Sequence, residues 1–395
     1  MTCILFDDPQ LRNHLLPLTY TRPISEIRVG ILTIREKWEK ALGQKPGYIT
    51  ASYLQKKYPL PKSSDYLFIN AALCPNAALL KEIESLRNGE GILHNGNLLA
   101  AKHNEPGIPM IENLICKNFE ADINLIDRVW KIFSLNAAEL KTDFSFITAG
   151  RQSAAIQDKH TIVYNRNQIF LEEGVNIKAA VLNAEDGPIY LGKNAVVQEG
   201  ALIKGSFALC EGSHVNMGAK MRGDTTIGPF SKVGGEISNS VIFGYSNKAH
   251  DGFLGNAVIG EWCNIGADSN NSNLKNNYEN VKLWSYVKNG FEDTGLQFCG
   301  LIMGDHSKCG INTMFNTGTV IGVSANIFGD GFPRNFIPSF AWGGAAGFTT
   351  FQLKKAFETT EKVMARRKVV FDEVEKNILE KVFELSALQR VWEKK

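Results

Sequence analysis

The chain has 395 residues, which is long enough for two domains and a sizeable core. Hydrophobic residues make up 44% of it and charged residues 21%, and the formal net charge is +2. This near-neutral balance excludes the basic field on which proteins that bind nucleic acids or membrane surfaces depend. We therefore expect neither a nucleic-acid nor a membrane partner.

Seven cysteines are scattered through the sequence, and none of them forms a CxxC pair. A structural zinc site or a disulfide framework is therefore not expected. The first apolar run, Ile4–Phe6, is too short for a signal peptide, and no apolar run approaches the about 18 residues of a membrane span. These features indicate a cytoplasmic protein with reduced cysteines and no bound metal.

The first part of the chain has the pattern of an α/β domain. Short apolar strands are predicted at Thr2–Phe6 and Tyr66–Ile69, and helices at Ile34–Leu42 and Asn76–Arg87. Such alternation favours a layered, parallel sheet.

A change in polarity marks the end of this domain. Apolar residues at helical spacing indicate a helix over Ala121–Ser134, and the polar segment Asn136–Lys159 is interpreted as a linker. We therefore expect a first domain at residues 1–150 and a second domain at residues 151–345.

A six-residue repeat dominates the second domain. Every sixth position from Leu191 to Val233 is aliphatic, and the residue four places later is small or polar in most cases. These aliphatic positions are Leu191, Val197, Ile203, Leu209, Val215, Met221, Ile227 and Val233. Neither a helical nor a strand period explains this spacing, whereas a triangular coil with one inward residue per side does. The sequence therefore predicts a solenoid of stacked β-coils.

The repeat is lost and then resumes further along the chain. Residues 234–258 and 267–302 break the period, and regular hexads return between Met303 and Ile327. A solenoid tolerates extra residues as outward loops, which often carry function. We therefore expect two outward loops, and the asparagine-rich run Asp268–Tyr278 is either a solvated loop or a ligand-binding loop.

The last part of the sequence has a helical pattern. Residues 346–395 form the predicted tail, in which a broken amphipathic helix begins near Thr349 or Thr350. Its expected role is to brace the end of the solenoid or to pack against a neighbouring subunit.

Three stretches of the second domain carry a more specific signal. Gly235–His250, Phe253–Gly260 and Asn264–Ala267 resemble the acetyltransferase core of the bifunctional UDP-N-acetylglucosamine pyrophosphorylase/glucosamine-1-phosphate N-acetyltransferase family. The resemblance extends well over residues 189–330 and faintly over residues 1–150. It implies a nucleotidyltransferase-like (Rossmann-like) α/β domain, then a left-handed parallel β-helix and a C-terminal α-helical tail. It also implies a homotrimer with active sites between subunits.

The resemblance assigns roles to four residues of this sequence. His250 matches the catalytic base, and Asn264 matches the asparagine of the Asn-Ile-Gly-Ala motif. Asn273 matches the asparagine near the acetyl group, and Arg222 resembles the arginine that holds the sugar phosphate. Imidazole, with a pKa of about 6.5, also suits deprotonation of a sugar amine at neutral pH. His214 and His306 lie inside regular hexads, where a structural role is the simpler interpretation.

Two positions depart from the family pattern. A tyrosine is replaced by Phe253, and the lysine of a Glu-Ile-Lys-Asn segment is replaced by Ser238. Both replacements would weaken contacts with a sugar phosphate. The identity of the acceptor therefore stays open.

The first domain lacks the features that bind a nucleoside triphosphate in related nucleotidyltransferases. The expected glycine-rich loop is replaced by Asp7–Arg12, a lysine by Ile24, and a metal-binding aspartate by Asn70. Close approach of the backbone to phosphates and neutralisation of their charge would both suffer. Arg12 and Arg22, with Arg28, are residual candidates for phosphate contacts, and ion-paired structural residues are the alternative.

Three functions compete on this evidence. The first is acetyl-CoA-dependent N-acetylation of an amino-sugar phosphate, foremost glucosamine-1-phosphate, in UDP-N-acetylglucosamine biosynthesis. A uridylyltransferase step with UTP and Mg²⁺ in the first domain stays open. The second is acylation of another amino sugar, including a nucleotide-linked one. The third is a non-catalytic trimer that binds a sugar nucleotide.

Overall fold

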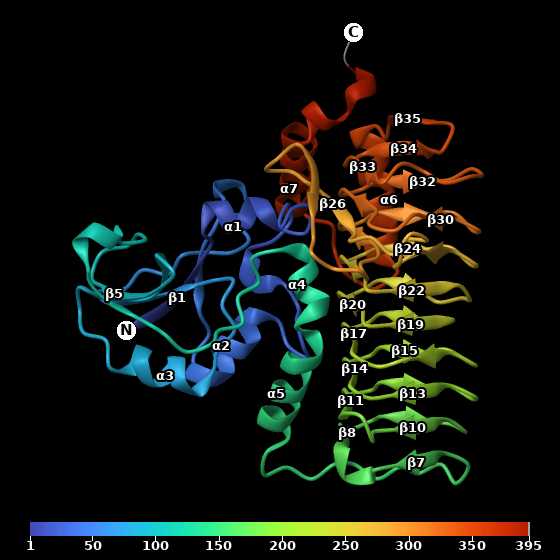
Figure 1. Ribbon diagram of the computed structural model, residues 1–395, viewed down its shortest axis with the longest axis horizontal. Helices are drawn as coiled ribbons and strands as arrows, with labels where there is room; N and C mark the ends of the chain where they lie inside the picture. Colours follow the sequence, from blue (N-terminus) through green and yellow to red (C-terminus); the bar gives the residue numbers. More distant parts are fainter. Residues whose placement is uncertain (394–395) are drawn as a thin grey trace. The chain divides into compact units, whose positions relative to one another are not determined.

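The computed structural model describes residues 1–393 and divides into two compact units (Figure 1). The first unit comprises Met1–Ile27 and Leu32–Arg128, and the second comprises Arg28–Ile31 and the described chain from Val129 onward. This division lies before the boundary that we expected near residue 150, because two helices between residues 129 and 148 belong to the second unit. No helix of the described chain combines the length and the apolarity that a membrane crossing requires.

The first unit is built on a six-stranded sheet in the order β2-β1-β3-β5-β4-β6. Its strands are β1 (Thr2–Phe6), β2 (Gly47–Ile49), β3 (Tyr66–Asn70), β4 (Glu90–His94), β5 (Asn97–His103) and β6 (Ile115–Asn118). The prediction of a parallel sheet was wrong in part, because β5 runs antiparallel to both β3 and β4. Asn95 and Gly96, both with positive φ, join β4 to β5 in the two-residue turn typical of a hairpin.

Three α-helices accompany this sheet: α1 (Pro9–His14), α2 (Ile34–Leu42) and α3 (Ala77–Glu84). The predicted bounds of α2 are confirmed, since Thr33 and Glu36 form a capping box and Gly43 ends the helix in the left-handed conformation. Helix α3 begins after its N-cap, Asn76, and ends at Glu84, three residues earlier than predicted.

Helices α4 (Val129–Ser134) and α5 (Asn136–Thr148) correct two further predictions. Only the last six residues of the helix predicted over Ala121–Ser134 are helical, and most of the predicted linker is α5. The polar side chains misled the interpretation because they are buried. Asn136 Oδ1 accepts a hydrogen bond from the Gly30 amide at 2.7 Å, and Asp143 Oδ2 accepts one from the Ile31 amide at 2.8 Å.

The second unit contains a left-handed parallel β-helix with three flat faces. Parallel pairing joins each strand to the equivalent strand of the next coil (Figure 1). One face contains β7 (Ile162–Tyr164), β10 (Val181–Asn183), β13 (Leu202–Lys204), β16 (Lys220–Met221), β19 (Glu236–Ser238) and β22 (Phe253–Gly255). The second contains β8 (Ile169–Leu171), β11 (Ile189–Leu191), β14 (Phe207–Leu209), β17 (Thr225–Ile227), β20 (Val241–Ile242), β23 (Val258–Ile259), β28 (Ile302–Met303), β31 (Val320–Ile321) and β33 (Phe336–Ile337).

The third face is the one that carries the candidate site. It contains β9 (Asn176–Ile177), β12 (Val196–Val197), β15 (His214–Val215), β18 (Lys232–Val233), β21 (Asn247–Lys248), β24 (Asn264–Ile265), β29 (Lys308–Cys309), β32 (Asn326–Ile327), β34 (Ala341–Gly344) and β35 (Gly347–Thr350). The coils therefore begin well before Leu191, because β7 and β8 already pair with later strands.

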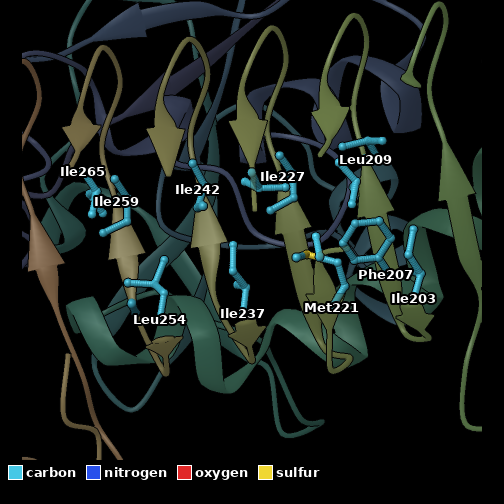
Figure 2. Close-up of a cluster of buried hydrophobic side chains, with 14 of the residues drawn as sticks. Ile203, Phe207, Leu209, Met221, Ile227, Ile237, Ile242, Leu254, Ile259 and Ile265 are labelled. Carbon is cyan, nitrogen blue, oxygen red and sulfur yellow. The ribbon is translucent and has the colours of Figure 1, made fainter. Parts of the chain in front are cut away.

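The interior of the prism confirms the repeat. All eight aliphatic residues from Leu191 to Val233 are at most 2% exposed, and they point into the prism with their later equivalents (Figure 2). The small residues four places later, such as Ala195 and Ser213, are fully buried at the corners. Removal of these apolar side chains from water is the main force that holds the coils together.

The first predicted interruption does not leave the prism. Between residues 234 and 258 the coils continue through β19, β20, β21 and β22, with inward residues Ile237, Ile242, Lys248 and Leu254. The sides are shorter here, so the inward residues follow one another at intervals of four to six. The six-residue count fails although the coil persists, and the expectation of an outward loop was wrong.

The second interruption is an outward excursion, as predicted. Strand β25 (Asn270–Asn271) first pairs with β30 (Met314–Phe315), and the chain then leaves the prism. The excursion contains the hairpin of β26 (Lys282–Ser285) and β27 (Gly290–Asp293). Trp284 anchors it by stacking on Phe336, with ring centroids 4.1 Å apart.

The tail forms two helices, α6 (Leu353–Ala365) and α7 (Glu373–Leu385). Thr349 and Thr350 lie in β35 and do not cap α6, so the predicted start of the helix was too early. The chain breaks between the helices, where Lys368 has positive φ and Asp372 caps α7. The helices are part of the second unit.

Candidate active site

The third face of the β-helix presents a column of polar side chains on its outer surface. Strand register places His214 beside Lys232, Lys232 beside Asn247, Asn247 beside Asn264, and Asn264 beside Lys308. Each of these residues directly precedes an inward residue of the prism. Since neighbouring residues of a strand point to opposite faces, the side chains of the column point outward. We call this set the outer column.

A cavity of about 640 Å³ lies over the middle of the outer column. Its lining comes from consecutive coils and from the end of α6. The lining residues are Lys232, Tyr245, Asn247, Ala249, His250, Trp262, Cys263, Asn264, Ile265, Gly266, Ala267, Lys308, Ile311, Val363, Arg366 and Arg367. The structure therefore brings two of the predicted site residues, His250 and Asn264, into one cavity.

The position of His250 follows from the turn after β21. The turn lies at a corner of the prism, and His250 is exposed there. The carbonyl oxygen of Ala249 accepts a hydrogen bond from Asn216 Nδ2 at 2.8 Å. The carbonyl oxygens of His250 and Asp251 accept hydrogen bonds from the ammonium of Lys248, at 2.6 Å and 3.1 Å. The backbone that carries the imidazole is therefore fixed by two side chains.

The cavity is strongly cationic. Four of its lining residues carry a basic side chain (Lys232, Lys308, Arg366 and Arg367), and none of the described lining residues is acidic. Arg367 also donates a hydrogen bond to Asn247 Oδ1 at 3.3 Å, which ties the end of α6 to the outer column. Such a concentration of positive charge suits a polyanionic ligand.

Two titratable groups register this environment. Burial lowers the pKa of Lys308 from 10.5 to about 8, and its ammonium donates to the carbonyl of His306 at 2.8 Å. Burial, reinforced by Lys232 and Arg367, lowers the pKa of His214. The shift at His214 is therefore partly a consequence of the basic residues beside the cavity, because neighbouring positive charge disfavours the imidazolium.

An aromatic stack forms the corner of the prism beside the cavity. Phe230, Tyr245, Trp262 and His306 occupy equivalent left-handed corner positions of successive coils. The rings of Tyr245 and Trp262 are 4.1 Å apart and 8° from parallel. His306 is buried at the end of this stack, which supports the structural interpretation of that residue.

The other two predicted residues of this unit lie outside the cavity. Arg222 is exposed beside β16 and forms an ion pair with Glu236 at 2.9 Å. Asn273 donates from Nδ2 to Asn256 Oδ1 at 2.8 Å at the start of the outward excursion. The asparagine-rich run continues into a separate cavity of about 650 Å³, whose lining includes Asn276 and Asn277.

The predicted arginines before residue 30 are used internally. Arg12, in the first unit, is buried and forms an ion pair with Asp7 at 2.7 Å. It also donates to the carbonyl of Arg22 at 3.0 Å and to the hydroxyl of Tyr53 at 3.2 Å. Arg22 is buried as well, and so is Arg28, which belongs to the second unit. These features favour a structural role over the phosphate contact that we considered.

The end of β3 also lacks the chemistry of a metal site. Asn70 is buried, donates to the carbonyl of Leu98 at 3.2 Å, and accepts from the amide of Ala72 at 3.0 Å. After β1 the chain enters α1 directly, because Asp8 accepts hydrogen bonds from the amides of Gln10 and Leu11. Within residues 1–393 no group of three potential ligands could hold a metal ion.

Sequence reasoning missed the basic residues of the cavity. Lys232 and Lys308 carried a usable signal, since each precedes an inward residue in the same sheet as Asn264. Arg366 and Arg367 carried none, because nothing in a helical tail indicates which coil it contacts. Tyr245 and Trp262 could have been found as large residues at the corner positions.

Comparison with known proteins gives the ancestry of the first part of the chain. Residues 3–152 match the family model described as sugar nucleotidyl transferase. This part belongs to the sugar nucleotidyl transferase family. The matched segment covers the first unit together with α4 and α5 of the second.

Curated relatives combine such a domain with an acetyltransferase. A bifunctional sugar-1-phosphate nucleotidylyltransferase/acetyltransferase of Sulfurisphaera tokodaii is 30% identical over 42% of this chain and 40% of its own length. Bifunctional protein GlmU of Methanococcus maripaludis is 32% identical over 23% of this chain and 22% of its own. GlmU of Synechococcus elongatus is 25% identical over 46% and 37%. The matches span two fifths or less of these relatives, and the chain is a divergent member of their family.

Among solved structures, an Arabidopsis UDP-N-acetylglucosamine acyltransferase covers 60% of this chain and 94% of its own, at 14% identity and a TM-score of 0.29. AntD, an N-acyltransferase from Bacillus cereus in complex with dTDP and coenzyme A, covers 54% and 100%, at 11% identity and a TM-score of 0.22.

Proposed function

We propose that this protein is an acetyl-CoA-dependent N-acetyltransferase that acts on an amino-sugar phosphate. One observation carries the proposal: His250 and Asn264 line the same cavity, and four basic side chains surround it. A base and an anion-binding surface within one cavity are what the transfer of an acetyl group from a phosphorylated carrier to an amine requires.

The chemistry assigned to the site needs no enzyme nucleophile. The amine of the acceptor attacks the thioester carbonyl, the new C–N bond forms, and the C–S bond breaks as the thiolate of CoA leaves. His250 accepts the proton that the amine loses and delivers it to the thiolate. Holding both reactants in one cavity supplies much of the rate enhancement, since proximity replaces a bimolecular encounter.

The basic residues suggest how acetyl-CoA would be bound. Its phosphates carry several negative charges, and Lys232, Arg366 and Arg367 offer flexible or planar donors that suit them. Lys308 adds a fourth positive charge at neutral pH, since its lowered pKa of about 8 remains above 7. We therefore assign the basic side of the cavity to the phosphates and the side near His250 to the thioester.

The acceptor that we place first is glucosamine-1-phosphate, in UDP-N-acetylglucosamine biosynthesis. We assign Arg222 to the sugar phosphate and Asn273 to the acetyl end of the site. Neither lines the His250 cavity of a single chain, so the proposal includes a homotrimer in which a neighbouring copy supplies them. Phe253 and Ser238 favour the second candidate, another amino sugar, because both lack groups that contact a sugar phosphate.

Uridylyl transfer with UTP and Mg²⁺ is not part of the proposal. The residues of the first unit do not fit a metal-bound triphosphate, because Asn70 is engaged by the backbone and Arg12 by Asp7. A unit that binds a sugar nucleotide without turnover remains the alternative for residues 3–152, and calorimetry with UTP and UDP-N-acetylglucosamine would test it.

The decisive experiment measures thiol release from acetyl-CoA with glucosamine-1-phosphate and with a panel of free and nucleotide-linked amino sugars. The wild type should acetylate one of them, and His250→Ala should lower kcat by about 10²–10⁴-fold, the usual contribution of a general base. His160→Ala, at an exposed histidine outside the cavity, is the matched control and should retain activity. Full activity in His250→Ala would contradict the proposal.

A further inference from the structure

An unusual lysine lies inside the prism next to His250. Lys248 occupies the inward position of β21, in register with Val233 of the preceding coil, and is 2% exposed. The inward residues of this sheet are otherwise apolar in the neighbouring coils (Val197, Val215, Val233, Ile265, Cys309 and Ile327). An ammonium group therefore replaces a hydrocarbon at one position of a hydrophobic column.

This replacement does not serve the stability of the coil. Transfer of an ammonium from water into an apolar interior is unfavourable, and burial lowers the pKa of Lys248 from 10.5 to about 8. Among the described residues Lys248 forms no ion pair, and its ammonium donates only to the carbonyls of His250 and Asp251. An aliphatic residue would suit the column better, so the lysine must contribute something else.

The contacts of Lys248 identify that contribution. Residues 249–251 form the turn that presents His250 to the cavity, and each of their carbonyl oxygens is held by a donor. Asn216 holds Ala249 from the preceding coil, and Lys248 holds His250 and Asp251 from within the prism. The amide of Asp268, on the following coil, also donates to the carbonyl of Asp251 at 3.0 Å. The turn is thus secured from below, inside and above.

We propose that Lys248 is a positioning residue that fixes the His250 turn from inside the prism. It draws two carbonyl oxygens inward and so keeps the imidazole on the outer side, facing the cavity. This inference rests on the proposed role of His250 as the base. Lys248 itself touches neither reactant, because its ammonium is enclosed by the turn that it holds.

The test replaces the charge while it keeps the volume. Lys248→Met should lower kcat by about 30- to 100-fold, since a displacement of about 1 Å at a reacting group has an effect of this order. The KM for acetyl-CoA should be unchanged, and the unfolding temperature should be equal to or higher than that of the wild type. Ile227→Met, at a fully buried position of a regular coil, is the matched control and should leave kcat unchanged.

Chemical rescue separates positioning from general packing. Lys248→Ala leaves space for a small amine, so added propylammonium should restore part of kcat, whereas 1-propanol of similar size should not. Equal rescue by both compounds would show that filled volume matters and the charge does not, which would overturn the proposal. An unchanged kcat in Lys248→Met would overturn it as well.

A readout without turnover keeps this inference apart from the proposed function. The ¹⁵N-labelled imidazole signals of His250, identified by their loss in His250→Gln, should shift in Lys248→Met and not in Ile227→Met. If the wild type acetylates no acceptor but these signals shift, the proposed function fails and the positioning role stands. If they do not shift, the positioning role fails whatever the activity.

Discussion

The two units of this protein use the same kind of side chain in opposite ways. In the first unit, Arg12 is buried and bound to Asp7, backbone carbonyls and a tyrosine hydroxyl. In the second, Lys232, Arg366 and Arg367 line a cavity that contains no acidic residue among its described lining. A basic residue therefore says little about ligands until its partners are known, because a paired cation stabilises a fold and an unopposed one attracts an anion.

The largest effect that would test this contrast is on the stability of the first unit. Arg12→Met should leave the Asp7 carboxylate buried without its partner and lower the free energy of unfolding by about 3–5 kcal/mol. Urea denaturation measures the change. The double variant Asp7→Leu/Arg12→Met removes both charges and should recover part of the loss. Wild-type stability in Arg12→Met alone would mean that the pair is not structural.

The next effect concerns the cavity of the second unit. Arg366→Ala and Arg367→Ala should each weaken binding of acetyl-CoA by about tenfold, since a hydrogen bond to a charged group contributes roughly 1.5 kcal/mol or more. Calorimetry at two salt concentrations measures this, and the loss should shrink as salt rises. Lys376→Ala removes an exposed cation of α7 that pairs with Glu373, and it should not change the affinity.

A smaller effect sharpens the structural side of the comparison. Thr33→Ala removes the side-chain half of the capping box of α2 and should lower the free energy of unfolding by about 1 kcal/mol. Acetyl transfer should be unchanged at temperatures where both units are folded. A change in kcat with intact stability would show that the first unit contributes to the reaction.

The smallest expected effect is a pH dependence of acetyl-CoA binding. Lys308 is protonated below its lowered pKa of about 8, so its attraction for an anion is present at pH 7 and is lost as the pH rises through 8. Affinity should fall by about threefold between pH 7 and pH 9, since a partly screened ion pair contributes about 0.2–1 kcal/mol. Lys308→Met should remove this slope, and its persistence would assign the titration to another group.

The regular part of the fold could be predicted from the sequence because the prism imposes a strict period. Each side admits one inward side chain, so the spacing alone places Leu191 to Val233 in the interior. The count failed after Val233 because the sides shorten there, and because Lys248 and Asn271 occupy inward positions as polar residues. Backbone carbonyls and the Gly255 peptide satisfy them, and an apolar pattern cannot indicate such compensation.

The candidate site was predictable only in part for a related reason. His250 and Asn264 lie in a contiguous motif, whereas the basic residues come from coils and a helix that meet only in three dimensions. The helix α5 was missed because its polar side chains bind backbone amides of residues 30 and 31, which a linker-like composition does not indicate. The hairpin of β4 and β5, by contrast, had a local signal in Asn95 and Gly96 that was overlooked.

The place of His250 along the stack of coils has a consequence for how the protein loses structure. Strand β20, in the same coil as the His250 turn, is the fifth of nine strands of its sheet, with four on either side. Solenoids open from their ends, because a terminal coil contacts one neighbour and an internal coil contacts two. Amide hydrogens near His250 should therefore exchange among the slowest of the β-helix, so that fraying at either end leaves the reactive centre intact.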